Sequence, residues 1–189
     1  FASGFDFPDD ARAVASVDWD HDGDLDLWVT NRTAPRLRFL NNNGSTGQRG
    51  VLVRLQGQSC NRDAIGARLE LIAADEPSQP LVRFVTAGSG FLSQSSKWVH
   101  FGVGARKGPF RLIIGWPGGP SETIEGLLPG NRYRVVEGSN RAIEQDERDI
   151  EISPGELLVV PPTGIARVPL LERLPLPQIG YLDESDRVR

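Results

Sequence analysis

Turn-forming residues divide this chain into short segments, and this division restricts the folds that it can adopt. Its 189 residues include 21 Gly and 14 Pro, and these fall at short intervals between apolar runs, as in all-β proteins. The one helical pattern, over residues 141–149, is polar on all sides and offers no face to bury. We therefore expect an all-β protein.

Polar and apolar residues alternate in several of these runs, as expected for strands that bury one face. Residues 68–71 and 132–135 show the alternation most clearly. The expected strands are Ala13–Val17, Leu25–Thr30, Leu37–Leu40, Val51–Leu55, Ala67–Ile72, Leu81–Thr86, Trp98–Val103, Phe110–Trp116, Glu122–Ile124, Arg132–Val136 and Glu156–Val160.

Composition changes at two points along the chain. Residues 41–50 read Asn-Asn-Asn-Gly-Ser-Thr-Gly-Gln-Arg-Gly, a turn-rich connector, and charged residues and Pro dominate from Ser139 onward. We expect three parts: an Asp-rich segment over residues 1–48, a strand-rich domain over 49–138, and an extended, Pro-rich C-terminal arm or linker over 139–189.

Charge and cysteine content exclude several classes of function. The net charge is −4 and the basic residues are scattered singly, which argues against nucleic-acid binding because phosphate contacts need clustered Lys and Arg. No run approaches the roughly 18 apolar residues that cross a bilayer, so we expect no membrane span. Cys60 is the only cysteine, which excludes an intrachain disulfide and a Cys-rich zinc site.

The most informative stretch is residues 18–26, which carry five carboxylates in nine residues. Side chains spaced two apart along a curled loop, with Gly23 at the sixth position, turn alternate oxygens toward one point, as a hard cation requires. We assign the side chains of Asp18, Asp20 and Asp22 as ligands, the backbone carbonyl of Asp24 as the next, and Asp26 as the closing carboxylate.

We expect the ion to be Ca²⁺ and its role to be structural. Position twelve of the loop is Val29 rather than the Glu that closes an EF-hand, and a strand follows instead of a helix. Mg²⁺ is a poorer fit because it prefers fewer protein ligands and retained waters. The alternative is a solvated acidic turn that binds no metal.

The loop and the residues downstream resemble two known families. Residues 17–31 are similar to the FG-GAP or VCBS repeat, the calcium-binding blade unit of integrin-α-type β-propellers. Four later motifs resemble the ASPIC and UnbV domain: residues 61–68 (NRDAIGAR), 88–95 (GSGFLSQS), 100–104 (HFGVG) and 116–119 (WPGG).

The resemblance implies a terminal β-propeller blade fragment with a calcium loop over residues 1–48, followed by a β-sandwich-like ASPIC/UnbV domain over 49–138. It also implies a secreted, extracellular or periplasmic protein, with roles in adhesion or assembly and no established catalytic residues. Propellers have about 4–8 blades. The remaining blades are therefore expected in the full-length chain or in another subunit.

Catalytic patterns are weak in this sequence. His100 lies in an apolar run without a partner acid or nucleophile, which favours a structural histidine. Ser93 and its neighbours lack the spacing of a serine hydrolase. We expect Trp116 to lie in the core, although stacking of a glycan near Trp98 or Trp116 stays open.

We therefore expect a non-enzymatic extracytoplasmic calcium-binding module for protein or cell-surface interaction, adhesion or scaffolding. Its expected partners are the remaining propeller blades and a protein or glycan ligand. The alternative is an accessory or docking domain of a larger enzyme or redox complex, whose catalytic module lies outside this chain. The Pro-rich stretch from Val160 onward motivates that alternative.

Overall fold

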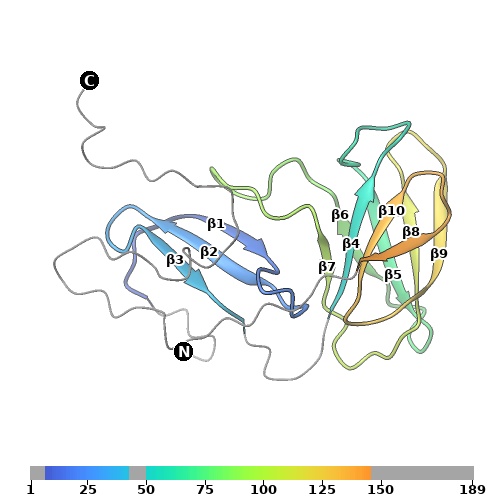
Figure 1. The fold of residues 1–189 in the computed structure, drawn as a ribbon, viewed down its shortest axis with the longest axis horizontal. Helices are drawn as coiled ribbons and strands as arrows, with labels where there is room; N and C mark the ends of the chain where they lie inside the picture. Colours follow the sequence, from blue (N-terminus) through green and yellow to red (C-terminus); the bar gives the residue numbers. More distant parts are fainter. Residues whose placement is uncertain (1–6, 43–49, 146–189) are drawn as a thin grey trace. The chain divides into compact units, whose positions relative to one another are not determined.

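The computed structural model describes residues 7–42 and 50–145, all within one compact unit that spans residues 1–150. These residues form eleven strands in three sheets and no helix (Figure 1), so the all-β prediction is confirmed. It follows that this part of the chain contains no helix long and apolar enough to cross a membrane. The expected strand Glu156–Val160 and nearly all of the Pro-rich C-terminal arm lie outside the described residues.

The first sheet is an antiparallel meander of β1 (Ala11–Val17), β2 (Asp26–Asn31) and β3 (Leu37–Leu40). Trp28 and Phe39 lie directly opposite each other on β2 and β3, with ring centroids 4.6 Å apart. Trp19, which follows β1, meets Trp28 edge-on at 5.1 Å. The three rings form an aromatic cluster on one face of the sheet.

The remaining strands form two four-stranded sheets. One has the order β11-β10-β4-β7, in which β10 pairs with β4 in parallel and the other neighbours are antiparallel. The other has the order β6-β5-β8-β9 and is antiparallel throughout. The bounds are β4 (Val51–Gln56), β5 (Arg68–Ala73), β6 (Leu81–Phe84), β7 (Val99–Phe101), β8 (Phe110–Gly115), β9 (Ser121–Leu127), β10 (Arg132–Val136) and β11 (Ala142–Gln145).

One hydrophobic core joins these two sheets. Val53 and Val135 from the first sheet and Leu69 and Leu112 from the second belong to a single cluster of buried side chains, and each is fully buried. Alternation explains the arrangement, because the core residues of β4 and β10 are separated by residues that face outward. The two sheets therefore form the expected β-sandwich.

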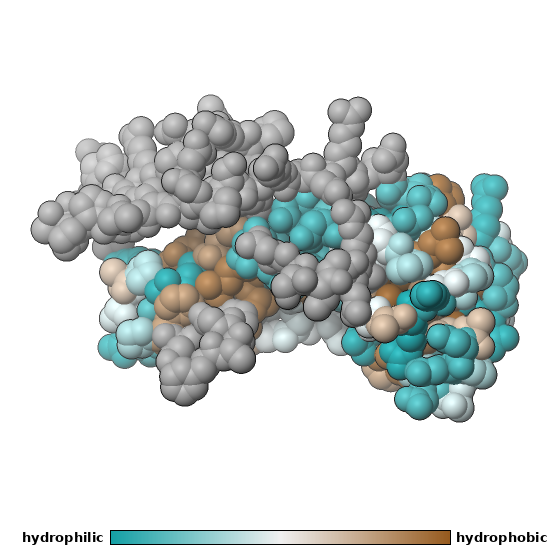
Figure 2. All heavy atoms as spheres, turned by 90° about the horizontal axis from the view of Figure 1, so that it is seen from below, coloured by the Kyte–Doolittle hydropathy of each residue, from teal (hydrophilic) through white to brown (hydrophobic). Residues whose placement is uncertain are grey.

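The three-stranded sheet has no comparable core within the described residues. None of the fully buried hydrophobic side chains in those ranges belongs to β1, β2 or β3, and the aromatic cluster stays half-buried. Figure 2 shows hydrophobic residues gathered over this part of the molecule. A half-buried apolar face of this kind is typical of a surface that packs against another part of a protein.

Residues 142–145 form a strand that the sequence analysis did not predict. The sequence pattern there was helical and polar, whereas the structure has β11, which pairs antiparallel with β10 from Arg132↔Gln145 to Val135↔Ala142. The pairing is a tertiary effect: β10 offers a free edge, and the turn at Ser139 returns the chain alongside it. The rest of that pattern, residues 146–149, lies outside the described part of the chain.

Candidate metal site

The aspartate loop joins β1 to β2 and is curled by its own side chains. The Asp22 amide donates to Oδ1 of Asp20 at 3.3 Å, and the Asp24 amide donates to Oδ1 of Asp22 at 2.8 Å. Gly23 has a φ of +95°, which a residue without a side chain adopts freely. The predicted sharp turn at the sixth position is therefore present.

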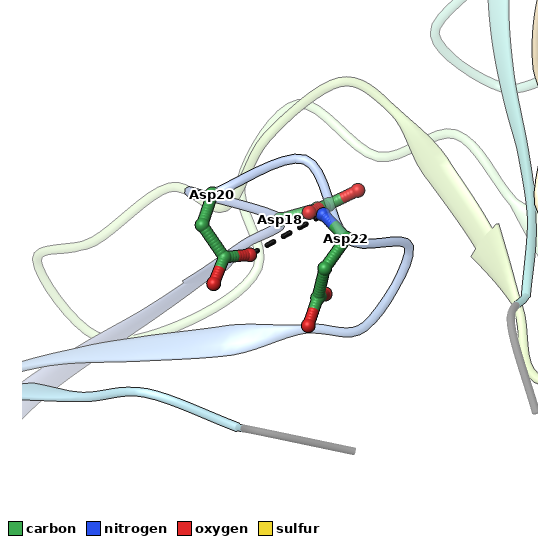
Figure 3. A group of neighbouring side chains, drawn as sticks. All are labelled: Asp18, Asp20 and Asp22. Atoms are coloured by element: carbon green, nitrogen blue, oxygen red, sulfur yellow. Dashed lines mark hydrogen bonds between the residues drawn. The ribbon is translucent and has the colours of Figure 1, made fainter. Parts of the chain in front are cut away.

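The curl brings three carboxylates together. One oxygen from each of Asp18, Asp20 and Asp22 lies within 4.8 Å of the others, and Figure 3 shows the three side chains gathered at the loop. The structure thus places the first three predicted side-chain ligands where one cation could contact all of them. It does not identify the metal.

Asp18 is the most informative of the three. Its side chain is 1% exposed, yet neither carboxylate oxygen makes a hydrogen bond of normal geometry within the described residues, and burial raises the pKa of Asp18 more than the Gly23 amide lowers it. The nearest cation is Arg132, whose Nη2 lies 4.0 Å from Oδ2 of Asp18, beyond hydrogen-bond distance. A buried carboxylate without donors is costly unless something else compensates its charge.

Electrostatics at the loop disfavour ionised carboxylates when no cation is bound. Burial raises the pKa of Asp20 to about 6, and the negative charges of Asp22 and Asp26 act in the same direction. Burial also raises the pKa of Asp18, against the opposing positive charge of Arg132. Oxygen donors held close together with raised pKa values are what a divalent cation would stabilise in the charged form.

Asp26 and Asp24 lie outside this cluster of three oxygens. Both oxygens of Asp26 accept backbone hydrogen bonds at 2.8 Å, Oδ2 from the Trp19 amide and Oδ1 from the Asn42 amide. Asp26 therefore closes the loop by tying its two ends together. Each oxygen keeps a second lone pair. Its metal-ligand role, and that of the Asp24 carbonyl, stay predictions.

The loop is also fastened to the sandwich. Nε2 of His100 lies 3.0 Å from the Gly23 carbonyl, so that nitrogen carries the proton, because a carbonyl only accepts. The Gly50 amide contacts the same carbonyl at 3.4 Å. His100 is half-buried and hydrogen-bonded, as expected for a structural histidine. The sixth position of the loop is thereby held against β7.

Arg132 is the residue that sequence reasoning missed. It is 7% exposed, and besides facing Asp18 its guanidinium carbon lies 4.7 Å from the ring centroid of Trp98. The alternation in residues 132–135 placed Arg132 on the polar face of its strand, but its distance from Asp18 in sequence concealed the pairing. The strand register sets Arg132 beside Leu52 and Leu52 beside His100. His100 in turn contacts the aspartate loop.

Two other residues weighed from sequence have structural surroundings. Trp116 is 4% exposed and belongs to the core cluster, which confirms that expectation. Cys60 is half-buried at the edge of the core, and burial, followed by the adjacent Glu137, raises the pKa of its thiol. A thiol with a raised pKa is a poor nucleophile at neutral pH.

The comparisons with known proteins support one of the two resemblances. A family model described as ASPIC and UnbV matches residues 57–142. An ASPIC/UnbV domain is therefore present over the part of the chain that forms most of the sandwich. A search of curated proteins found no match.

Proposed function

We propose that this chain is a non-enzymatic, extracytoplasmic calcium-binding module, in which the aspartate loop supports a β-propeller blade attached to the ASPIC/UnbV domain. The observation that carries the proposal is Asp18, because its buried carboxylate makes no hydrogen bond of normal geometry within the described residues and lies beside two further carboxylates. A bound cation accounts for both features at once.

The chemistry of the donors favours Ca²⁺. All three clustered ligands are carboxylates, and no His or Cys belongs to the cluster. Hard cations take such oxygens, and Ca²⁺ accepts six to eight of them in flexible geometry, whereas Mg²⁺ demands a tight octahedron and keeps its waters. The remaining coordination positions of the ion would be filled by Asp26, the Asp24 carbonyl and water. Calcium would supply positive charge there and fix the loop.

The proposed role is structural and interactive. The loop that would hold the ion is fastened to the sandwich through the Gly23 carbonyl, so metal binding would stabilise the junction between β1–β3 and the ASPIC/UnbV domain. The aromatic cluster on β2 and β3 is half-buried, and neighbouring propeller blades would cover it. Protein or cell-surface interaction, adhesion or scaffolding then follows as the function of the assembled module.

Location outside the cytoplasm is part of the same proposal. Extracellular calcium modules work with weak sites, with Kd values of about 10⁻⁴ to 10⁻³ M, which only a calcium-rich compartment fills. A loop with three clustered carboxylates and further ligands from water fits that class. The family match is also compatible with an accessory domain of a larger enzyme, and that alternative requires no calcium.

Calorimetric titration of the calcium-stripped chain tests the proposal. We expect one Ca²⁺ per chain with a Kd of about 10⁻⁴ to 10⁻³ M, and at least a tenfold weaker Kd for Asp22→Asn. Asp75→Asn is the matched control, because Asp75 is exposed and lies outside the cluster. Absence of binding at about 5 mM Ca²⁺, roughly five times the upper end of that Kd range, or equal weakening by Asp75→Asn, would overturn it.

A further inference from the structure

A polar pocket whose lining residues are distinct from the aspartate cluster opens on the outward face of the sheet β11-β10-β4-β7. It has a volume of about 240 Å³ and is lined by three arginines, two glutamines, one aspartate, one leucine and one tryptophan. Its charged, polar and aromatic lining residues include Arg54, Arg62, Arg134, Asp63, Gln56 and Trp98.

Strand register places two of the arginines side by side. Arg54 on β4 and Arg134 on β10 are direct partners in the parallel ladder, and neighbouring strands lie about 4.8 Å apart. Both follow the alternation that sends Val53 and Val135 into the core, so both side chains leave the sheet on its outward face. Two like charges in direct register repel each other.

A loop adds the third arginine. The chain turns back after β4, and the Gly57 amide donates to the Arg62 carbonyl at 2.9 Å, which fixes the base of that turn. A side chain on Gly57 would collide with the Asn61 carbonyl, so the tight turn depends on glycine. The turn sets Arg62 at the rim of the same pocket.

Within the described residues, no acidic side chain forms an ion pair with the three arginines of the pocket. Asp63 is the one acid in residues 7–42 and 50–145 that lines the pocket. Glu137, which directly follows β10, accepts the amides of residues 58–60 at 2.7, 2.8 and 3.1 Å. Among the described residues that line the pocket, three positive charges therefore face one negative charge, in a chain whose net charge is −4.

We propose that this pocket binds a phosphate or sulfate group, either free or as an ester on a larger molecule. Arg54 and Arg134 are partners in the strand ladder, and the planar N–H donors of arginine suit the oxygens of such groups better than lysine does. A doubly charged anion matches the excess positive charge, and Gln56 can add a neutral donor. The proposed anion site uses other residues than the calcium site, because none of these residues belongs to the aspartate cluster.

Calorimetric titration of the full chain in calcium-free buffer at low ionic strength tests this proposal. The probes are inorganic phosphate, inorganic sulfate and a monosaccharide sulfate ester, with chloride as the reference anion. We expect saturable binding of the divalent anions at one site, and at least tenfold weaker binding by the double variant Arg54→Gln/Arg134→Gln. Tighter binding of the ester than of free sulfate would identify a larger ligand, and equal binding a free anion.

Arg111→Gln is the matched control, because Arg111 is an exposed strand residue that lies outside the pocket. If the double glutamine variant fails to fold, Arg54→Lys/Arg134→Lys keeps both positive charges but removes the planar guanidinium N–H donors. We then expect several-fold weaker anion binding than in the wild type. Divalent anions that bind no better than chloride, or an equal loss in Arg111→Gln, would overturn the proposal.

Discussion

Asp18→Asn is the substitution that separates a metal ligand from an ordinary buried carboxylate. Asparagine keeps the shape of the side chain and removes its charge. Burial raises the pKa of Asp18 despite the nearby Arg132, so the charged form is disfavoured when no cation is present. The metal-free variant should therefore melt at the same temperature as the metal-free wild type or higher, although Arg132 loses its partner.

Calcium should make the wild type melt at a higher temperature than Asp18→Asn. With a Kd of about 0.5 mM, 5 mM Ca²⁺ stabilises the folded state by RT ln(1 + [Ca²⁺]/Kd), which is about 1.4 kcal/mol. For a chain of this size that free energy corresponds to a rise in Tm of about 3–6 °C. The wild type should show this rise, and Asp18→Asn should lose nearly all of it, because the variant lacks a charged ligand.

Thermal unfolding followed by circular dichroism, with and without calcium, is the assay. Magnesium at the same concentration controls for ionic strength and should raise Tm less. If the Tm of the wild type does not rise on addition of calcium, the loop does not bind calcium in the folded state. An Asp18→Asn variant that melts well below the metal-free wild type would also refute the reasoning, because the carboxylate would then be stabilising on its own.

The remaining predictions concern the loop turn, the core and the Glu137 contacts. Gly23→Ala should weaken calcium binding and destabilise the loop by about 1–2 kcal/mol, since Gly23 has a φ of +95°; calorimetry and thermal unfolding measure both. Leu112→Ala should cost about 2–5 kcal/mol in denaturant unfolding, because Leu112 is fully buried between the two sheets, whereas the exposed-site variant Arg111→Ala should change little. Three backbone amides lower the pKa of Glu137 from 4.5 to about 2, so the folded state binds its proton less readily than the unfolded state. The stabilising effect of Glu137 should be complete above pH 4.5 and vanish as the pH falls toward 2; the Tm difference between wild type and Glu137→Gln should shrink over that range, and a constant difference would contradict it.

Local sequence patterns located the sandwich well because its strands alternate. In β10 the polar residues at positions 132 and 134 flank Tyr133, and the predicted and observed bounds of that strand are identical. Each predicted strand within the described residues overlaps an observed one. Turn residues set the ends of these strands, and turn chemistry is local.

Patterns of this kind could not reveal β11. Ala142 and Ile143 are its only apolar residues, and the strand exists because the edge of β10 pairs with it. The same limit hid the Arg54–Arg134 pair, since parallel strands that are far apart in sequence leave no signal of their register. Long-range pairing is information that a single sequence read by local rules does not contain.

At the candidate metal site, too, the sequence predicts the local features but not the long-range contacts. The spacing of Asp18, Asp20 and Asp22 around Gly23 was sufficient to predict that their oxygens converge, because the loop closes on itself within a few residues. Spacing did not show that Asp26 ties the loop ends together. Nor did it show that Arg132 approaches Asp18 from another sheet.

A crystal structure of the full chain grown in calcium, with anomalous scattering recorded for the ion, tests the central claim most directly. We expect one anomalous peak at the β1–β2 loop, with oxygens of Asp18, Asp20 and Asp22 at about 2.3–2.6 Å from it. A loop without a peak, in which Asp18 pairs with Arg132 alone, would contradict the account.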